Sequence, residues 1–129
     1  MKKLSICLIF LASFASNQTN AQYISYDDCL EIIQQINPRM PVQINETTIG
    51  YKAACFRERN DGKLAYFYTV TGDGRSRLGA DQTQIVINTW CTQVQLRKLL
   101  KELVAVEFRY FDEAGNRLKT FKFSESACL

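Results

Sequence analysis

The side chains that most often carry out chemistry are scarce in this sequence. It contains no histidine, so the commonest general base, metal ligand and catalytic-triad member is missing. The most reactive groups left are five cysteines. One of them, Cys7, lies in an apolar N-terminal segment, and the other four are Cys29, Cys55, Cys91 and Cys128. These four are the first residues whose role has to be decided.

An even number of cysteines in an exported domain predicts disulfide bonds. A zinc site is the alternative, but the sequence has neither a CxxC pair nor a histidine. Four cysteines allow three pairings. We favour Cys29 with Cys55 and Cys91 with Cys128, because each bond would then join a helix to the sheet. All four thiols would be consumed, which leaves no cysteine nucleophile.

The remaining candidates for chemistry have simpler structural explanations. Asp27-Asp28 is typical of the first turn of a helix, and Asp112-Glu113 of an exposed turn. Asp73-Gly74 lacks the oxygen-ligand spacing of a calcium loop. No serine lies in a Gly-x-Ser-x-Gly context. We therefore expect no enzymatic activity, no cofactor and no metal site.

Residues 1–21 have the layout of a cleaved secretory signal. Lys2 and Lys3 precede an apolar run over 4–14, and a polar segment follows that ends in Ala21. We expect cleavage after Ala21, with Ala15 as the second choice. An uncleaved anchor is the alternative, but the run is shorter than the roughly 20 residues that span a bilayer. The expected location is periplasmic or secreted, with no membrane span after cleavage.

The expected mature chain, 22–129, is long enough for one small domain. Removing the signal also removes Lys2 and Lys3, so the formal net charge falls from +3 to +1. A chain this close to neutral gives no indication of nucleic-acid binding. Any partner is therefore expected to be another protein or an envelope component, and the oligomeric state is left open.

The first half of this domain predicts one helix and three strands. A stripe that starts at Cys29 and an Asn37-Pro38 stop predict a helix over 27–36. Residues 42–49 are β-branched and predict a short strand that Gly50 ends. Two longer strands, 51–59 and 63–71, flank an Asp61-Gly62 turn. That turn places Cys55 opposite Tyr68 and Ala53 opposite Val70, and pairs Phe56 with Phe67 on the other face.

The second half predicts two helical segments and a hairpin. Residues 72–79 form a glycine- and arginine-containing loop that we expect to be mobile. Residues 81–91 suit either a helix capped by Asp81 or a strand. Thr92 and Gln95 form a capping box for a helix with a leucine stripe. The strands 104–110 and 118–123 then pair so that residue numbers sum to 229, which puts their phenylalanines on the core face.

Together these elements predict an α+β fold in one small domain. Its antiparallel sheet consists of two hairpins plus the additional short strand, covered by two to three helices and stapled by two disulfides. The expected order is α-β-β-β-α-α-β-β. Trp90 is expected to pack against the adjacent disulfide.

Two surfaces are candidates for binding a partner. Phe56 and Phe67 could form an apolar patch on the face of the sheet that points away from the core. Arg75 and Arg77, in the loop 72–79, could contact an acidic partner. A solvated loop and ordinary packing are the simpler explanations of these residues.

Several segments together resemble a family of small exported bacterial proteins, the quorum-sensing-regulated virulence factors. The matching stretches are INPRMPVQINETT, LAYFYTV, NTWCTQVQLRKLL and VEFRYFDEAGNRL, followed by a terminal cysteine. They span about residues 30–128 and are structural motifs with no active-site residues to transfer. The resemblance implies that Cys91 and Cys128 belong to the shared pattern, and that Cys29 and Cys55 are an added pair.

These features favour an exported, non-enzymatic domain that binds another protein or an envelope component. One alternative is an assembly or pilot factor for a secretion or pilus machine, in which a helix and a sheet edge grip a partner segment. Another is an inhibitor of a hydrolase that uses the loop 72–79.

Overall fold

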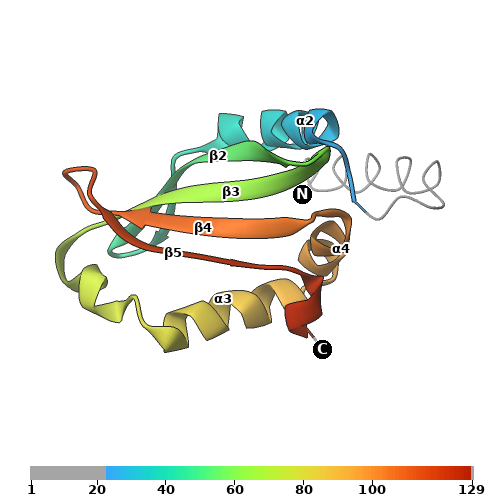
Figure 1. The fold of residues 1–129 in the computed structure, drawn as a ribbon. Coiled ribbons are helices and arrows are strands. Elements are labelled where there is room, and N and C mark those ends of the chain that lie inside the picture. The colour runs from blue at the N-terminus through green and yellow to red at the C-terminus, as the bar shows by residue number, and fades with distance from the viewer. Residues whose placement is uncertain (1–22, 129) are drawn as a thin grey trace.

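The computed structural model describes residues 23–128. The predicted signal peptide lies outside the described residues. Five strands form one sheet in the order β1-β2-β3-β4-β5. In Figure 1, α2 lies next to β2 and α3 lies next to β5. The predicted element order and α+β class are confirmed, and short 3-10 helices are added: η1 (Asn37–Arg39), η2 (Gly72–Arg77) and η3 (Glu125–Cys128).

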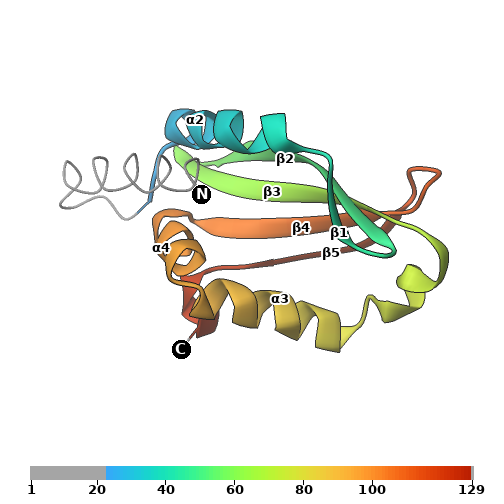
Figure 2. The same cartoon turned by 180° about the vertical axis from the view of Figure 1, so that it is seen from behind.

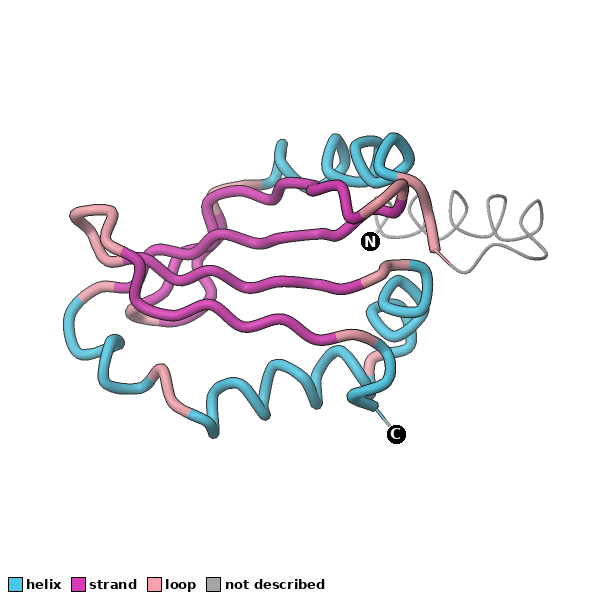
Figure 3. The backbone as a smooth tube through the Cα atoms, viewed as in Figure 1, coloured by secondary structure: helices cyan, strands magenta, loops and turns pink. Residues whose placement is uncertain are grey.

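The strand directions differ from the predicted antiparallel sheet in a single pairing. β3 (Asp61–Val70) and β4 (Ala105–Phe111) run parallel, whereas the other neighbours are antiparallel. A parallel pair needs a long crossover to bring the chain back to the same end. The helices α3 (Ala80–Thr92) and α4 (Val94–Glu102) supply it (Figure 3).

Helix α2 (Tyr26–Ile36) forms where the capping pattern predicts it. The side chain of Ser25 accepts a hydrogen bond from the Asp28 N–H at 3.1 Å. Cys29 and Ile32 are its buried residues, and they face β2 (Thr48–Glu58). Just past the helix, the side chain of Asn37 exchanges two hydrogen bonds with the backbone of Ala53, which fixes α2 on the sheet.

The first strand does not end at Gly50, so that prediction is wrong. β1 spans Val42–Asn45, and the side-chain oxygen of Asn45 accepts hydrogen bonds from the N–H and hydroxyl of Thr47, which makes the turn. Gly50 lies inside β2, opposite Tyr68. A Cβ there would come within 3.1 Å of the Tyr68 ring, so glycine serves close packing at this position.

The predicted Asp61-Gly62 turn is also wrong. The hairpin turns at Arg59-Asn60, with Glu58 paired to Asp61. Cys55 therefore lies opposite Leu64, and none of the three predicted pairs across this hairpin forms. Over 52–58 the register moves by an even number of residues, so Ala53, Cys55 and Phe56 keep their predicted faces.

One face of the sheet carries the core, and α2, α3 and α4 cover it; we call it the helical face. Its buried residues come from all three helices and from the central strands: Cys29, Ile32, Cys55, Leu64, Val70, Trp90, Leu100, Val106 and Phe108. Leu103, just after α4, is also fully buried. Residues 81–91 are thus resolved as helix, and the leucine stripe points inward as predicted.

Neither predicted capping box at the two later helices forms. The N-cap residues are Gly79 and Gln93, without side-chain capping bonds. Thr92 still belongs to α3, and its hydroxyl donates to the carbonyl of Asn88 at 2.8 Å. A threonine already bonded within one helix cannot cap the next.

The C-terminal hairpin has the predicted register. β5 (Arg117–Phe123) pairs with β4 so that Val106 lies opposite Phe123 and Phe108 opposite Phe121. Glu107 lies opposite Lys122, also as predicted, but it is not in water: only 7% of it is exposed. Trp90 packs edge-on against Phe108, at 6.0 Å between ring centroids.

Candidate functional site

A groove of about 410 Å³ opens on the helical face, between the β1–β2 hairpin and α3. Figure 2 views the molecule with β1 in front of the strands and α3 below them. The hairpin, the sheet and the helix line the groove with Ile44, Asn45, Thr48, Tyr68, Phe108, Tyr110, Gln82, Ile85, Val86, Thr89 and Trp90. Its volume falls in the range of ligand-binding pockets.

The floor of the groove is aromatic. The rings of Tyr68 and Tyr110 stack with centroids 5.0 Å apart, and Phe108 stacks on Tyr68 at 6.1 Å. Alternating positions on adjacent strands bring these rings together, because the parallel register sets Tyr66 beside Phe108 and Tyr68 beside Tyr110. Of these three rings, Tyr68 is partly exposed, whereas Phe108 and Tyr110 are each only 2% exposed, and the floor carries two hydroxyl groups.

Both floor phenols stay neutral. Burial raises the pKa of Tyr68 well above its usual range, and the neighbouring Tyr66 and Tyr110 raise it further. Burial also raises the pKa of Tyr110, against a smaller opposing effect of a hydrogen bond with Gln82. A neutral phenol can donate or accept a hydrogen bond without presenting charge to a ligand.

The two walls of the groove lack charge. Residues 82–92 of α3 and residues 42–45 of β1 contain no Asp, Glu, Lys or Arg, in a chain in which these residues make up 22%. Ile44 is 52% exposed and Ile85 is 65% exposed. An exposed helix normally carries charge on its open side, so an uncharged one with an exposed isoleucine indicates a surface for a partner.

The groove exists because α3 is held at its two ends. At its start, Lys119 of β5 donates to the Thr83 hydroxyl at 2.7 Å and to the Gly79 carbonyl at 3.0 Å. At its end lie Trp90, its one buried residue, and the disulfide of Cys91. Between these ends, the helix leaves part of the aromatic floor uncovered.

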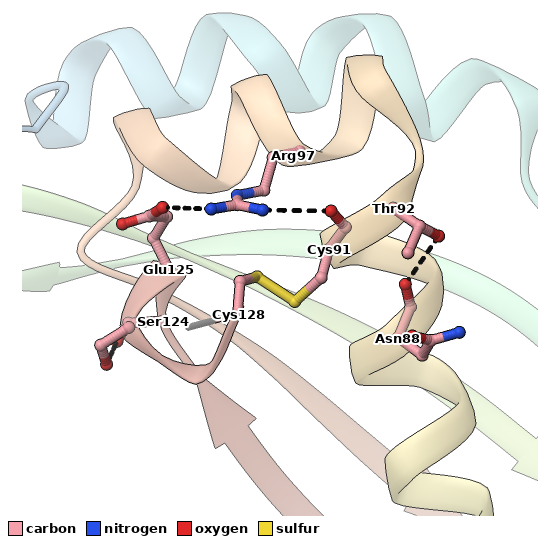
Figure 4. Close-up of a disulfide and its surroundings, with 8 residues drawn as sticks. Asn88, Cys91, Thr92, Arg97, Ser124, Glu125 and Cys128 are labelled. Atoms are coloured by element: carbon pink, nitrogen blue, oxygen red, sulfur yellow. Dashed lines mark hydrogen bonds and ion pairs between the residues drawn. A yellow bond between two sulfur atoms is a disulfide. The ribbon is translucent and has the colours of Figure 1, made fainter.

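Both predicted disulfides are present. Cys29 joins Cys55, and Cys91 joins Cys128. Figure 4 shows the second bond with Arg97 beside it: Arg97 donates to the Cys91 carbonyl at 3.2 Å and forms an ion pair with Glu125 at 2.7 Å. The end of α3, the start of α4 and η3 are thus joined at one place.

The predicted Phe56/Phe67 patch has a different structure. The two rings are on the predicted face, but Phe56 lies opposite Lys63 and Phe67 opposite Lys52. The guanidinium of Arg109 lies over both rings, 4.5 Å from the centroid of Phe56 and 5.2 Å from that of Phe67. Phe67 is only 8% exposed. Cations therefore cover these rings, and little open apolar surface remains.

The loop with Arg75 and Arg77 is ordered as η2. Arg77 forms an ion pair with Asp73 at 3.3 Å, and Arg75 lies 3.9 Å from the carboxylate of Asp112. Gly74 is buried where a Cβ would meet Thr47. The loop thus contacts neighbouring turns through Gly74 and Arg75, and its mobility stays a prediction. The side chains of both arginines remain more than half exposed, and neither belongs to the groove lining.

The groove itself was not predicted from the sequence. The predicted hairpin puts Tyr68 and Val70 on the same face as Cys55 and Ala53, which is the helical face, but it does not predict how completely the helices cover that face. The overlooked signal was the stretch 82–92: it is uncharged, and its apolar stripe is too weak to bury the whole helix. Within residues 23–128, no three potential metal ligands gather, and no helix has the length and hydropathy of a membrane span.

Comparisons with known proteins place the fold. No protein-family profile and no curated protein matches the sequence. Among solved structures, a Pseudomonas aeruginosa protein described as secreted has a TM-score of 0.66 and 14% identity, over 81% of this chain and 92% of its own. A pilotin of the Vibrio vulnificus type 2 secretion system has a TM-score of 0.58 and 8% identity, over 81% and 91%. A type II secretion pilotin from Vibrio cholerae has a TM-score of 0.57 and 9% identity, over 76% of this chain and 86% of its own. At these identities the likeness establishes a shared fold.

Proposed function

We propose that this protein is an exported, non-enzymatic domain that binds an apolar segment of another envelope protein in the groove. The observation that carries the proposal is the pair of uncharged walls, each with an exposed isoleucine, on either side of an aromatic floor. The absence of histidine and the bonding of Cys29, Cys55, Cys91 and Cys128 support a binding role over a catalytic one. Two disulfides support an oxidising compartment outside the cytoplasm.

The groove can supply useful binding energy. Complete burial of an exposed isoleucine side chain contributes roughly 1.5–3 kcal/mol. Ile44 is 52% exposed and Ile85 is 65% exposed, so covering them contributes roughly 1–2 kcal/mol apiece, and the partly exposed ring of Tyr68 adds to this. No charged group lines the groove, so binding an apolar ligand does not require a charged side chain to lose its hydration.

A pilot factor for a secretion machine is the second candidate. Two proteins with this fold are pilotins of type II secretion systems, which favours a role in assembling such a machine. Membership of the quorum-sensing-regulated virulence factors stays a prediction. The hydrolase-inhibitor alternative depends on Arg75 and Arg77, and their ion pairs with acidic neighbours make it the weaker idea.

In-cell photo-crosslinking tests the groove. A crosslinker at Ile85 should give a defined adduct with an envelope protein, and one at Val94, which is 81% exposed on α4, should not. The substitution Ile44→Lys, on the opposite wall, should abolish the Ile85 adduct while thermal unfolding stays unchanged. Equal adducts from positions 85 and 94, or an adduct that survives Ile44→Lys, would contradict the proposal.

A further inference from the structure

We propose that the partner segment binds in extended form and adds as a sixth strand to the open edge of β1. This inference rests on the proposed function and concerns the conformation and chemistry of the segment that the groove takes. Its basis is a difference between the two edges of the sheet, together with the position of β1 beside the groove.

The two edge strands carry opposite kinds of residue. β5 contains Arg117, Lys119 and Lys122, and charged side chains on an edge discourage pairing with another chain. β1 contains none: its sequence is VQIN, all four residues are exposed, and Val42 and Ile44 are 43% and 52% exposed. Of the two edge strands, β1 is the one without charged side chains that discourage pairing.

β1 also borders the groove directly. Ile44 and Asn45 belong to its lining, so a strand paired with β1 would lie between β1 and α3, above the aromatic floor. Side chains of a strand point alternately to its two faces, so every second residue would point at Tyr68, Phe108 and Tyr110. The backbone would provide the register, and the floor would select apolar side chains.

The features of β1 that limit strand pairing set how much it can contribute. The strand has four residues and a register irregularity between Gln43 and Asn45. The side-chain amide of Gln43 donates a hydrogen bond to the backbone carbonyl of Asn45, so this carbonyl is already an acceptor within β1. A short edge gives only a few backbone hydrogen bonds, so the edge alone would not hold a partner. This explains why the edge and the groove must act together.

The chemistry of the occupant follows from the lining. None of the eleven lining residues is charged. A segment with charged residues facing the floor would lose their hydration without gaining a counter-ion. We therefore infer an uncharged segment with β-branched or aromatic residues at alternate positions.

Synthetic peptides test this assignment with the intact mature protein. The probe is a capped, uncharged peptide of about six residues, the usual strand length, with Val or Ile alternating with Thr or Ser. Two further versions carry N-methyl amides on one or the other set of alternate residues. A fourth peptide is an amphipathic helix of matched composition. Trp90, the single tryptophan, lines the groove and reports binding by its fluorescence.

The extended peptide should change the Trp90 fluorescence and slow hydrogen exchange at residues 42–45 by at least tenfold. One N-methylated version should lose binding and the other should keep it, because only one edge of the added strand faces β1. Val42→Lys should weaken binding at least tenfold. Val94→Lys, which changes an exposed valine outside the groove in the same way, should leave it unchanged.

Other outcomes would overturn the inference in distinguishable ways. Binding of the helical peptide alone, without protection of residues 42–45, would reject strand addition and leave the groove proposal standing. No fluorescence change with any peptide would count against the groove as well. Self-association that Val42→Lys abolishes would reassign the edge to a second copy of this chain.

Discussion

Gly62 lies where α2 comes closest to β3. A Cβ at this position would be 2.6 Å from the Cβ of Cys29 and 2.9 Å from the carbonyl oxygen of Ser25. The Gly62 N–H also donates to the carbonyl of Ile24 at 2.9 Å. The absence of a side chain therefore lets the start of α2 lie directly on the sheet, and no flexible neighbour can yield.

We predict that Gly62→Ala lowers the free energy of unfolding by about 1–3 kcal/mol, the usual cost of forcing extra volume into a packed site. Urea denaturation monitored by circular dichroism measures it. Gly79→Ala is the control for added volume: no atom lies within 4 Å of a Cβ built there, and only the smaller cost of a less favourable N-cap residue is expected. Equal stability of the two variants would show that α2 can shift without cost.

Glu107 is a buried charged residue on the face of the sheet opposite the helical face. Its carboxylate forms ion pairs with Lys63 and Arg109, both at 2.8 Å. Burial by itself would raise the pKa of Glu107, but the hydrogen bonds and charges of Arg109 and Lys63 outweigh it and lower the pKa below its usual value. These three side chains and Phe56 and Phe67 cover the central strands where no described helix does.

A lowered pKa in the folded state makes the stability depend on pH. Glu107 should contribute its full stabilisation above the ordinary carboxyl pKa, and lose it as the pH falls through the lower folded-state value. Glu107→Gln should therefore cost about 1–3 kcal/mol at neutral pH and flatten the part of the stability curve below the ordinary carboxyl pKa. Denaturation at a series of pH values tests this. Glu113→Gln, in the exposed turn, should leave the curve unchanged.

At the scale of elements, α3 is the least embedded helix. Trp90 is its one buried residue, and the disulfide of Cys91 and the hydrogen bonds of Lys119 hold its two ends. A wall of this kind keeps its position through a few strong contacts. Its position should depend on those contacts more than on its own sequence.

We predict that the double substitution of Cys91 and Cys128 by serine costs about 2–4 kcal/mol, as expected for a bond that closes a loop of this length. It should also speed hydrogen exchange across α3 and weaken binding in the groove. Serine at Cys29 and Cys55 should cost a similar amount but leave exchange in α3 unchanged. Equal exchange in both variants would show that packing alone positions α3.

The elements also differ in how far local sequence determines them. The register of β4 with β5 follows from the phenylalanine alternation, because a slip of one residue would put every ring in water. The β2–β3 turn did not follow. Asp61-Gly62 is a strong turn signal, yet Gly62 is required in β3 for contact with α2, so the turn forms at Arg59-Asn60. A contact with a distant helix outweighed a local preference.

At the scale of the whole molecule, the helices cover only part of the helical face of the sheet. α2 and α4 bury their sides of the helical face, whereas α3 leaves the ring of Tyr68 partly exposed at the groove. The other face is covered by its own cations and rings. A partner therefore finds open apolar surface on the helical face, and the crosslinking and peptide experiments both address that place.

The sequence by itself determined the features that depend on composition and short-range pattern. The absence of histidine, the even set of cysteines, the leucine stripe of α4 and the C-terminal hairpin could all be read directly, because each depends on residue type or a spacing of a few positions. The cysteine pairing also followed, since each bond joins one helix to the rest of the fold.

Only the tertiary structure decided the features that depend on distant segments. These are the parallel pairing of β3 with β4, the burial of Glu107, the cations over Phe56 and Phe67, and the groove between β1 and α3. Each arises from residues far apart in the chain whose approach is set by packing. The groove forms where no other element packs over the sheet. A periodic pattern predicts which side chains point inward, but it does not predict whether another element packs against all of them.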